Sequence, residues 1–167
     1  YEDINPASNS YGQYIGPESY SGNVSLYYFG KAGWSHCRHR FGVLNDLYLE
    51  LVSEGITDVS IMGMNGYQYI NDAYGCMICD DTCTSSTCDA GPRILPWTQD
   101  LDSDGDETGD VWESWDITLR DLVFLDRNGY YVTRINLTSY NPDPDGMGEC
   151  TDNYSTIKQL ILDLLEE

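Results

Sequence analysis

Apolar residues in the first half of the chain follow the patterns of a strand, a helix and a second strand. The run "VSLYYF" at residues 24–29 is β-branched and aromatic, which is typical of a buried strand. From Phe41 to Val52, apolar residues recur every three or four positions, and Gly55 is the glycine that commonly follows a helix. A second apolar run, "DVSIMGM", covers residues 58–64. This order predicts a parallel β-α-β unit with a right-handed crossover.

The second half of the chain ends in a predicted hairpin and a predicted helix. Segments 121–126 and 130–137 are strand-like and flank "RNG", in which Asn-Gly accepts the positive φ angles of a tight turn. A polar loop rich in Pro and Gly then leads to a helix that we expect Thr151 or Asp152 to cap. One face of this helix is apolar and comprises Ile157, Leu160, Ile161, Leu164 and Leu165.

With a short helix at residues 67–75, the predicted elements follow the order β-α-β-α-β-β-α, which is that of the thioredoxin fold. We therefore predict one thioredoxin-like α/β domain over residues 22–167, with a central mixed β-sheet flanked by helices. Residues 1–21 form an irregular N-terminal arm, and residues 76–116 form a Cys-rich and acidic insertion. In α/β sheets, sites form at the carboxyl ends of parallel strands, where "GWSHC" at residues 33–37 lies.

The charge of the chain excludes several classes of partner. Lys and Arg number 8 against 28 Asp and Glu, so the formal net charge is −20. Because so few basic residues cannot neutralise many phosphates, we expect no nucleic-acid partner. The same deficit disfavours anionic membrane surfaces, and no stretch approaches the roughly 20 apolar residues of a membrane span. Cations and basic proteins are the partners that such a surface attracts.

The cysteines indicate a secreted, disulfide-bonded protein. Four of the 6 cysteines crowd into one short segment: Cys76, Cys79, Cys83 and Cys88. Two small loops closed by disulfides are favoured there over a zinc site, because the spacing is irregular and histidine is missing. A chain that begins at Tyr1 without a signal-peptide pattern is expected to be a processed product. Candidate glycosylation sites for an exported chain are Asn23, Asn136 and Asn153.

Residues 33–66, "GWSHCRHRFGVLNDLYLELVSEGITDVSIMGMNG", resemble the N-terminal thioredoxin-like domain of the selenoprotein P family. That family has a selenocysteine-x-x-Cys motif, a leucine-patterned helix that ends in Glu-Gly, and a strand that ends in an Asn-containing turn. Here Cys37 falls on the cysteine of the motif. Later segments, "LPWTQD", "DVW" and "DLVFLDRNGYYV", extend the resemblance over residues 24–166. The resemblance implies an extracellular thiol redox activity, the reduction of peroxides or disulfides, that uses Cys37.

Two residues depart from the pattern of that family. Trp34 stands where the family has selenocysteine, so the attacking chalcogen is absent. Arg120 stands where many thioredoxin-like proteins have a cis-proline before the hairpin. Both departures favour a protein in which the redox site has decayed.

The residues around Cys37 allow three interpretations. At a helix N-terminus, beside His36, His39 and two arginines, its thiolate would be stabilised by the helix dipole and by positive charge, which suits a nucleophile or a resolving thiol. The ligands in "HCRH" also suit copper or zinc, although the adjacent arginines oppose a cation. We favour a structural disulfide between Cys37 and Cys150, because the cysteines are even in number and the loop before the last helix approaches this end of the fold.

The loop "DLDSDGDETGD" is the candidate cation site. It carries Asp100, Asp102, Asp104, Asp106 and Asp110. The first three aspartates and Gly105 match the start of an EF-hand loop, but Val111 stands where such a loop has Glu. A shorter calcium loop, closed by Asp110 or Glu113, stays open as an interpretation. The alternative is a solvated loop, since neighbouring carboxylates repel one another unless a cation or water relieves the repulsion.

Together these features predict a secreted, disulfide-braced thioredoxin-fold module that is non-catalytic, serves in binding or assembly, and holds calcium in its acidic loop. A thiol redox protein that uses Cys37 is the alternative. The Tyr-rich arm, with Tyr11, Tyr14 and Tyr20, is where we expect self-assembly or a protein partner. Arms of this composition are expected to be either disordered or ordered by a partner.

Overall fold

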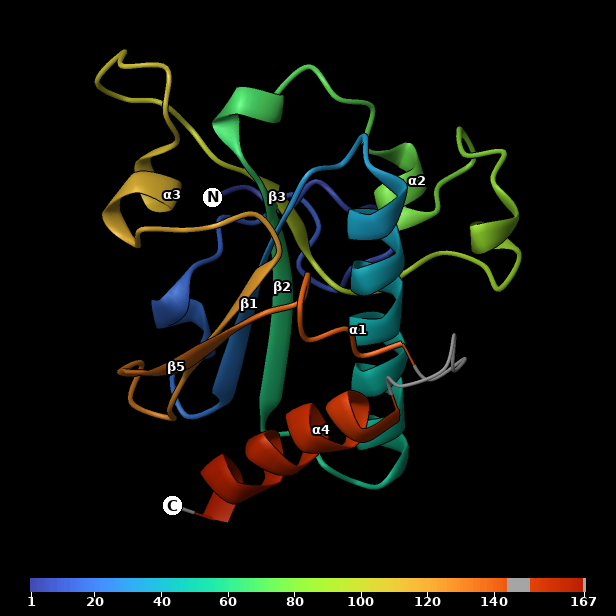
Figure 1. Cartoon of the computed structure of the whole chain (residues 1–167), viewed down its shortest axis with the longest axis vertical. Helices are drawn as coiled ribbons and strands as arrows, with labels where there is room; N and C mark the ends of the chain where they lie inside the picture. The colour runs from blue at the N-terminus through green and yellow to red at the C-terminus, as the bar shows by residue number, and fades with distance from the viewer. Residues whose placement is uncertain (144–150, 167) are drawn as a thin grey trace.

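The structure, a computed structural model, describes residues 1–143 and 151–166 and has a five-stranded sheet at its centre (Figure 1). The strand order is β3-β2-β1-β4-β5. The strands are β1 (Val24–Gly30), β2 (Val59–Asn65), β3 (Trp97–Gln99), β4 (Asp121–Leu125) and β5 (Tyr131–Asn136). Strands β1 and β2 are parallel, and β4 and β5 are antiparallel. The predicted β-α-β unit and hairpin are therefore confirmed.

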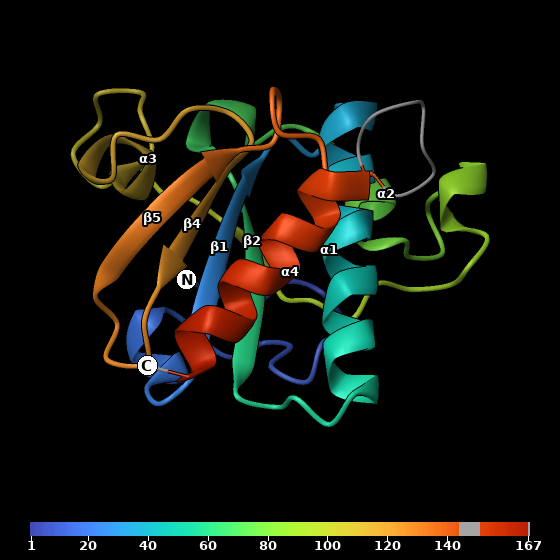
Figure 2. The same cartoon turned by 60° about the horizontal axis from the view of Figure 1, so that its bottom comes forward.

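Helices cover both faces of the sheet. The long helices α1 (Ser35–Ser53) and α4 (Thr151–Glu166) pack on one face, and Figure 2 shows α4 crossing in front of the strands with α1 beside it. The opposite face is covered by α3 (Asp110–Ser114) and by the 3₁₀ turn η1 (Pro17–Tyr20) of the N-terminal arm. The remaining short elements are η2 (Tyr67–Tyr69), α2 (Gly75–Ile78) and η3 (Ser86–Cys88). None of the helices in the described ranges has the length and apolar content to cross a membrane.

Strand β1 is buried at every residue. Its even-numbered side chains, such as Leu26 and Tyr28, point to the α1/α4 face, whereas Tyr27 and Phe29 point to the α3 face. This explains why β1 is a continuous apolar run and shows no alternation, because a central strand in a sheet covered on both faces has no polar side.

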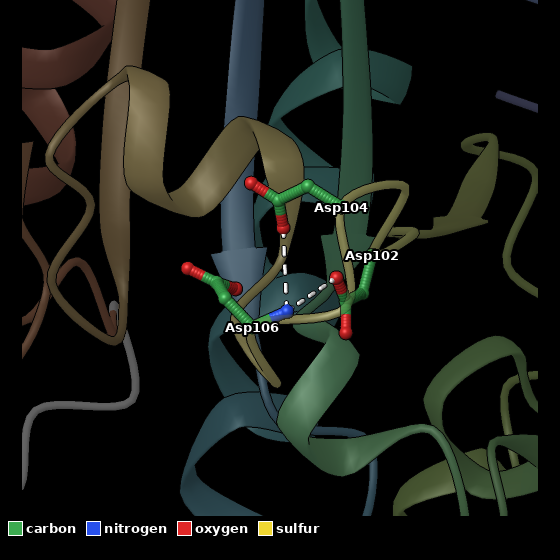
Figure 3. A group of neighbouring side chains, drawn as sticks. All are labelled: Asp102, Asp104 and Asp106. Atoms are coloured by element: carbon green, nitrogen blue, oxygen red, sulfur yellow. Dashed lines mark hydrogen bonds between the residues drawn. The ribbon is translucent and has the colours of Figure 1, made fainter.

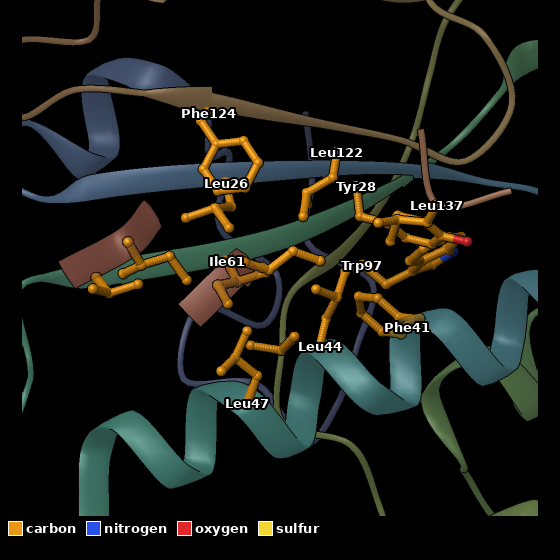
Figure 4. Packing of buried hydrophobic residues seen from close by; sticks show 14 of the residues in the cluster. Leu26, Tyr28, Phe41, Leu44, Leu47, Ile61, Trp97, Leu122, Phe124 and Leu137 are labelled. Atoms are coloured by element: carbon orange, nitrogen blue, oxygen red, sulfur yellow. The ribbon is translucent and has the colours of Figure 1, made fainter. Parts of the chain in front are cut away.

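The structure corrects the interpretation of residues 76–116 as an insertion outside the sheet. Strand β3 lies within that segment and pairs in parallel with the end of β2, at Gly63–Asn65. Trp97 of β3 is completely buried, and its ring centroid lies 4.9 Å from that of Phe41 on α1 (Figure 4). A Cβ atom on Gly63 would lie 2.3 Å from the Trp97 ring, so only glycine allows this indole to lie against β2.

The N-terminal arm is ordered by its own domain. Asp3 is fully buried, and its Oδ1 accepts hydrogen bonds from the backbone N–H groups of Asn5 (3.0 Å) and Trp97 (3.1 Å). The Asn5 side-chain amide donates to the carbonyl oxygens of Arg93 (2.8 Å) and Leu95 (2.7 Å). The expectation that this arm is disordered or ordered only by a partner is therefore wrong. Self-assembly through the arm stays a prediction.

Replacement of Gly63 by Ala should destabilise the domain by about 1–3 kcal/mol, because the new methyl group overlaps the Trp97 ring and forces it to move. Urea denaturation followed by tryptophan fluorescence measures the change. Gly16→Ala is the matched control, since a Cβ atom there meets nothing within 4 Å and the backbone is extended at φ −174°. Equal losses in the two variants would contradict the packing described here.

Candidate functional site

The junction between β1 and α1 holds Trp34, which is 47 % exposed and immediately precedes the helix. The Nζ atom of Lys31 lies 4.9 Å from the centre of the Trp34 ring and 4.6 Å from the centre of the Tyr69 ring. Cation–π attraction in this geometry holds the lysine between the two rings. The backbone N–H of Gly33 donates to Asp72 Oδ2 at 3.0 Å. Trp34 therefore forms the exposed surface at the place where a thioredoxin-like fold presents its attacking group.

Cys37 is the third residue of α1, within its first turn, and is buried completely. The Tyr28 hydroxyl donates a hydrogen bond to the Cys37 carbonyl oxygen at 3.1 Å. Burial raises the pKa of Tyr28 well above 10, the neighbouring Cys37 adds to this increase, and the charges of Arg120 and Arg40 oppose it. Tyr28 thus stays a neutral donor. The first turn of α1 is therefore fixed to the core, and the Cys37 side chain packs into that core.

The cysteine pairings are confirmed in the cluster but not at Cys37. Disulfides join Cys76 to Cys83 and Cys79 to Cys88, which gives the two small loops that the spacing predicted. Cys37 is a free thiol, so the structure does not contain the predicted structural disulfide at this residue. The proposed partner, Cys150, lies outside the described residues. The thiol is protected by packing, since Cys37 belongs to the main hydrophobic cluster.

The two histidines of "HCRH" do not converge on the thiol. His36 is exposed. His39 Nε2 lies 2.7 Å from Oδ2 of Asp143, a buried carboxyl group on the segment that follows β5. Within residues 1–143 and 151–166, the only group of three or more metal-ligating side chains lies elsewhere, in the acidic loop. His39 thus ties α1 to the segment after β5, and within the described residues the histidines form no metal-ligating group with Cys37.

Arg120, the residue directly before β4, has an unusual backbone conformation. Its φ angle is +73°, and no peptide bond in the described segments is cis. The Arg120 N–H donates to the Phe29 carbonyl oxygen (2.8 Å), and its own carbonyl accepts from Leu137 N–H (2.9 Å). The side-chain Nε donates to Thr138 Oγ1 at 2.9 Å. Arg120 therefore joins the end of β1 to the end of the hairpin.

Three of the five predicted calcium ligands lie together. Each of Asp102, Asp104 and Asp106 offers an oxygen atom, and these atoms lie within 4.8 Å of one another (Figure 3). The loop is closed by backbone donors, because the N–H of Gly105 donates to Asp102 Oδ1 at 2.6 Å and that of Glu107 donates to Asp102 Oδ2 at 3.0 Å. These three carboxylates could hold a hard cation.

The other two aspartates of the loop have structural roles. Asp100 is fully buried, and its carboxylate accepts hydrogen bonds from the N–H groups of Val111 (3.3 Å) and Trp112 (3.1 Å) at the start of α3. Burial raises the pKa of Asp100, and these hydrogen bonds oppose the increase. Asp110 accepts from the N–H and hydroxyl of Ser103, which lowers its pKa. The prediction that all five aspartates share one site is wrong, because Asp100 follows a buried strand and caps a helix.

At the three candidate glycosylation sites, the amide nitrogen that would carry a sugar is already a hydrogen-bond donor. Asn23 donates to Ser60 Oγ at 2.9 Å. Asn136 Nδ2 donates to the Leu119 carbonyl oxygen at 3.1 Å and to Asp121 Oδ1 at 2.8 Å. The third, Asn153, donates to the carbonyl oxygen of Asn141 at 3.0 Å. A sugar replaces one of the two hydrogens on that nitrogen, so Asn136, which donates twice, would lose a hydrogen bond on glycosylation. Glycosylation at the three residues stays a prediction.

Comparison with solved structures confirms the thioredoxin-like fold. The chain is similar to a thiol-disulfide isomerase from Corynebacterium glutamicum, with a TM-score of 0.61 and 13% identity, over 93% of this chain and 88% of the other. It is similar to a thioredoxin-like protein from Bacteroides vulgatus, with a TM-score of 0.57 and 14% identity, over 99% and 82% of the two chains. The thioredoxin domain of a thiol-disulfide oxidoreductase from Bacteroides vulgatus gives a TM-score of 0.53 and 18% identity, over 90% and 87%.

No protein-family model and no curated protein sequence matches the chain. Identities this low establish the fold alone, because one fold supports many activities and activity belongs to the site. The narrower resemblance to selenoprotein P stays a prediction. What is established is a thioredoxin-like α/β domain with two disulfides, and with a buried free thiol at its β1–α1 junction.

Cys37 should resist alkylation in the folded chain. We expect iodoacetamide to modify it at least ~100-fold more slowly in native buffer than in urea, because the reagent needs a local opening that costs a few kcal/mol. Peptide mass spectrometry without reductant measures both rates and shows which cysteines are paired. Modification at the same rate in both states, or a peptide that links Cys37 to Cys150, would contradict the buried free thiol.

Proposed function

We propose that this chain is a disulfide-braced thioredoxin-fold module that acts in binding or assembly and does not catalyse disulfide exchange at its β1–α1 junction. The proposal rests on which residues of that junction are exposed and which are buried. The exposed position that precedes the helix holds Trp34, and the thiol three residues later, Cys37, has no exposed surface.

Thiol–disulfide exchange requires an accessible thiolate that attacks a substrate sulfur and forms a mixed disulfide. In a Cys-x-x-Cys pair, the first residue makes this attack and the second resolves the intermediate. Cys37 stands at the second position, beneath the first turn of α1, and the Tyr28 hydroxyl holds its backbone. The junction therefore retains the resolving thiol and lacks the group whose intermediate it would resolve.

The compartment follows from the two disulfides of the Cys-rich segment. Bonds of this kind persist in oxidising surroundings and are rare where glutathione and thioredoxin keep thiols reduced. The pairs Cys76–Cys83 and Cys79–Cys88 close short loops next to α1, and the free thiol among the described cysteines, Cys37, is fully buried. We infer that the chain works outside the reducing cytosol, as a secreted protein.

Replacement of Trp34 by Cys should create a Cys-x-x-Cys pair with Cys37 at the start of α1. We expect wild-type chain to reduce insulin disulfides at the background rate with dithiothreitol as electron donor, and Trp34→Cys to do so at least ~10-fold faster, since an exposed thiol at a helix N-terminus has a lowered pKa. Trp34→Ser, which has a similarly small side chain and no thiol, is the matched control and should stay at background.

The alternative function, a thiol redox protein that uses Cys37, is favoured by the printed names of the similar structures, which include a thiol-disulfide isomerase. It makes the opposite prediction in the same assay. Wild-type activity well above background that Cys37→Ser abolishes would replace our proposal with this alternative.

A second proposal concerns calcium in the acidic loop, and the convergence of Asp102, Asp104 and Asp106 supports it. Oxygen ligands of this kind suit Ca²⁺, whose extracellular concentration fills even millimolar sites. We propose that calcium binding there stabilises the connection between β3 and α3.

Calcium at 10 mM, about ten times the dissociation constant of the weakest such sites (~1 mM), should raise the melting temperature by about 2–4 °C, the shift that 1 kcal/mol of stabilisation gives in a domain of this size. The double variant Asp104→Asn/Asp106→Asn should lose this response, because neutral amides bind the ion more weakly. Asp89→Asn, an exposed aspartate in the Cys-rich segment, is the control. An unchanged melting temperature of wild type with calcium and with chelator would leave the solvated loop as the correct interpretation.

A further inference from the structure

Arg93 is a buried guanidinium that lacks an ion-pair partner within the described ranges. Its side chain lies beside α1, and the residue is only 6 % exposed. The ion pairs formed by residues 1–143 and 151–166 involve other cationic side chains. A buried charge without a partner is costly, so proteins usually pair such groups. An arginine held in this way calls for an explanation.

Of the three nitrogen atoms in the Arg93 guanidinium, one, Nη1, donates a hydrogen bond to the described part of the chain. Its Nη1 donates to the Met77 carbonyl oxygen at 2.7 Å, and this is the one side-chain hydrogen bond that it makes to the described part of the chain. The Nε and Nη2 groups, which together form one edge of the guanidinium, remain available. Gly42 keeps this edge close to the helix backbone, since a Cβ atom there would lie 2.7 Å from Nη2 and 3.2 Å from Nε.

A cavity of about 310 Å³, which Arg93 lines, lies between α1 and the Cys-rich segment. Besides Gly42, its lining residues are His39, Val43, Asp46, Thr87, Arg93 and Asp143. We call it the Arg93 cavity. Neither Trp34 nor Cys37 lines it, so its role is independent of the function proposed for the β1–α1 junction.

We propose that the Arg93 cavity binds the carboxylate of a small acid or of a peptide, with the Nε–Nη2 edge of Arg93 as its main contact. Two parallel N–H groups at fixed spacing match the two oxygens of a carboxylate, and such bidentate bonds are among the strongest that side chains form. The ligand would supply the ion-pair partner that Arg93 lacks among residues 1–143 and 151–166.

The charges around the cavity favour a monovalent carboxylate over a divalent anion. Asp46 and Asp143 line the cavity, and their negative charge would repel phosphate more strongly than a carboxylate. His39 Nε2 lies 2.7 Å from Asp143 Oδ2 and is a polar partner of that carboxylate. Val43 offers an apolar wall to the aliphatic part of a ligand.

The protonation state of Arg93 agrees with this role. Burial lowers the pKa of Arg93 to about 10, the charge of Asp46 opposes the decrease, and the charge of Arg38 adds to it. The guanidinium thus remains charged at neutral pH, although it is less favourably solvated than an exposed arginine. A desolvated cation gains more from a bound carboxylate than a hydrated one does.

The first experiment is a titration of wild-type chain with propionate, followed by ¹H–¹⁵N NMR of the arginine Nε–Hε groups at constant ionic strength. We expect a saturable shift of the Arg93 resonance and no saturable shift of Arg134, an arginine on β5 that serves as an internal control. Phosphate at the same ionic strength should shift Arg93 less than propionate does. No saturable shift at Arg93, or an equal shift at Arg134, would overturn the proposal.

The second experiment uses Arg93→Met, which removes the charge and keeps an apolar side chain of similar length. We expect at least a ~10-fold loss of propionate affinity, read from the propionate-dependent rise in melting temperature, because the bidentate contact is lost. The melting temperature without propionate should be equal or higher, since an unpaired buried charge is gone. Arg134→Met should keep the propionate response, and an unchanged response in Arg93→Met would overturn the proposal.

A short peptide with a free C-terminal carboxylate, compared with its amidated form, then identifies the source of the carboxylate. Tighter binding of the free acid than of propionate would assign a chain terminus as the ligand. Equal or weaker binding would assign a small organic acid, and both results support the site. If Arg93→Met does not fold, the titration of wild-type chain decides the proposal alone.

Discussion

The complete burial of β1 is the constraint on which the rest of the molecule depends. This strand pairs with β2 on one edge and with β4 on the other, and its side chains contact hydrophobic clusters on both faces. A strand held from four directions cannot shift in register without moving every apolar side chain to the wrong face. The segment that follows β1 and leads into α1 therefore starts from a fixed position.

That constraint decides the state of the β1–α1 junction. Helix α1 packs against the sheet through Phe41, Leu44 and Leu47 (Figure 4). This packing holds its first turn against the core. The Tyr28 hydroxyl extends from β1 to the Cys37 carbonyl and holds that turn. Cys37 is consequently a core residue, and Trp34 is the exposed side chain at the junction.

The sequence predicted those parts of the fold whose patterns are long and local. The β-α-β unit, the hairpin around Asn128-Gly129 and the last helix each extend over many residues of one periodicity. Strand β3 was missed because three residues are too few to show a pattern, and its position depends on Asp3 and Asn5, some ninety residues earlier in the chain. The disulfide loops were predictable from close spacing, and their connectivity was not. Asp100 was assigned wrongly because spacing alone cannot distinguish a buried cap from a ligand.

Arg93 shows most clearly what the sequence could not reveal, since a single arginine between Pro92 and Pro96 forms no pattern. Its burial depends on Gly42, which is adjacent to it only in the folded chain. The chain as a whole carries a charge of −20, which repels anions at long range and slows their approach. At physiological ionic strength, however, charges more than about 8 Å away are largely screened. A guanidinium inside a cavity is screened much less, so contacts at short range decide whether an anion stays bound. An acidic protein can therefore hold a carboxylate, provided that the guanidinium is buried and one of its edges is free to donate hydrogen bonds.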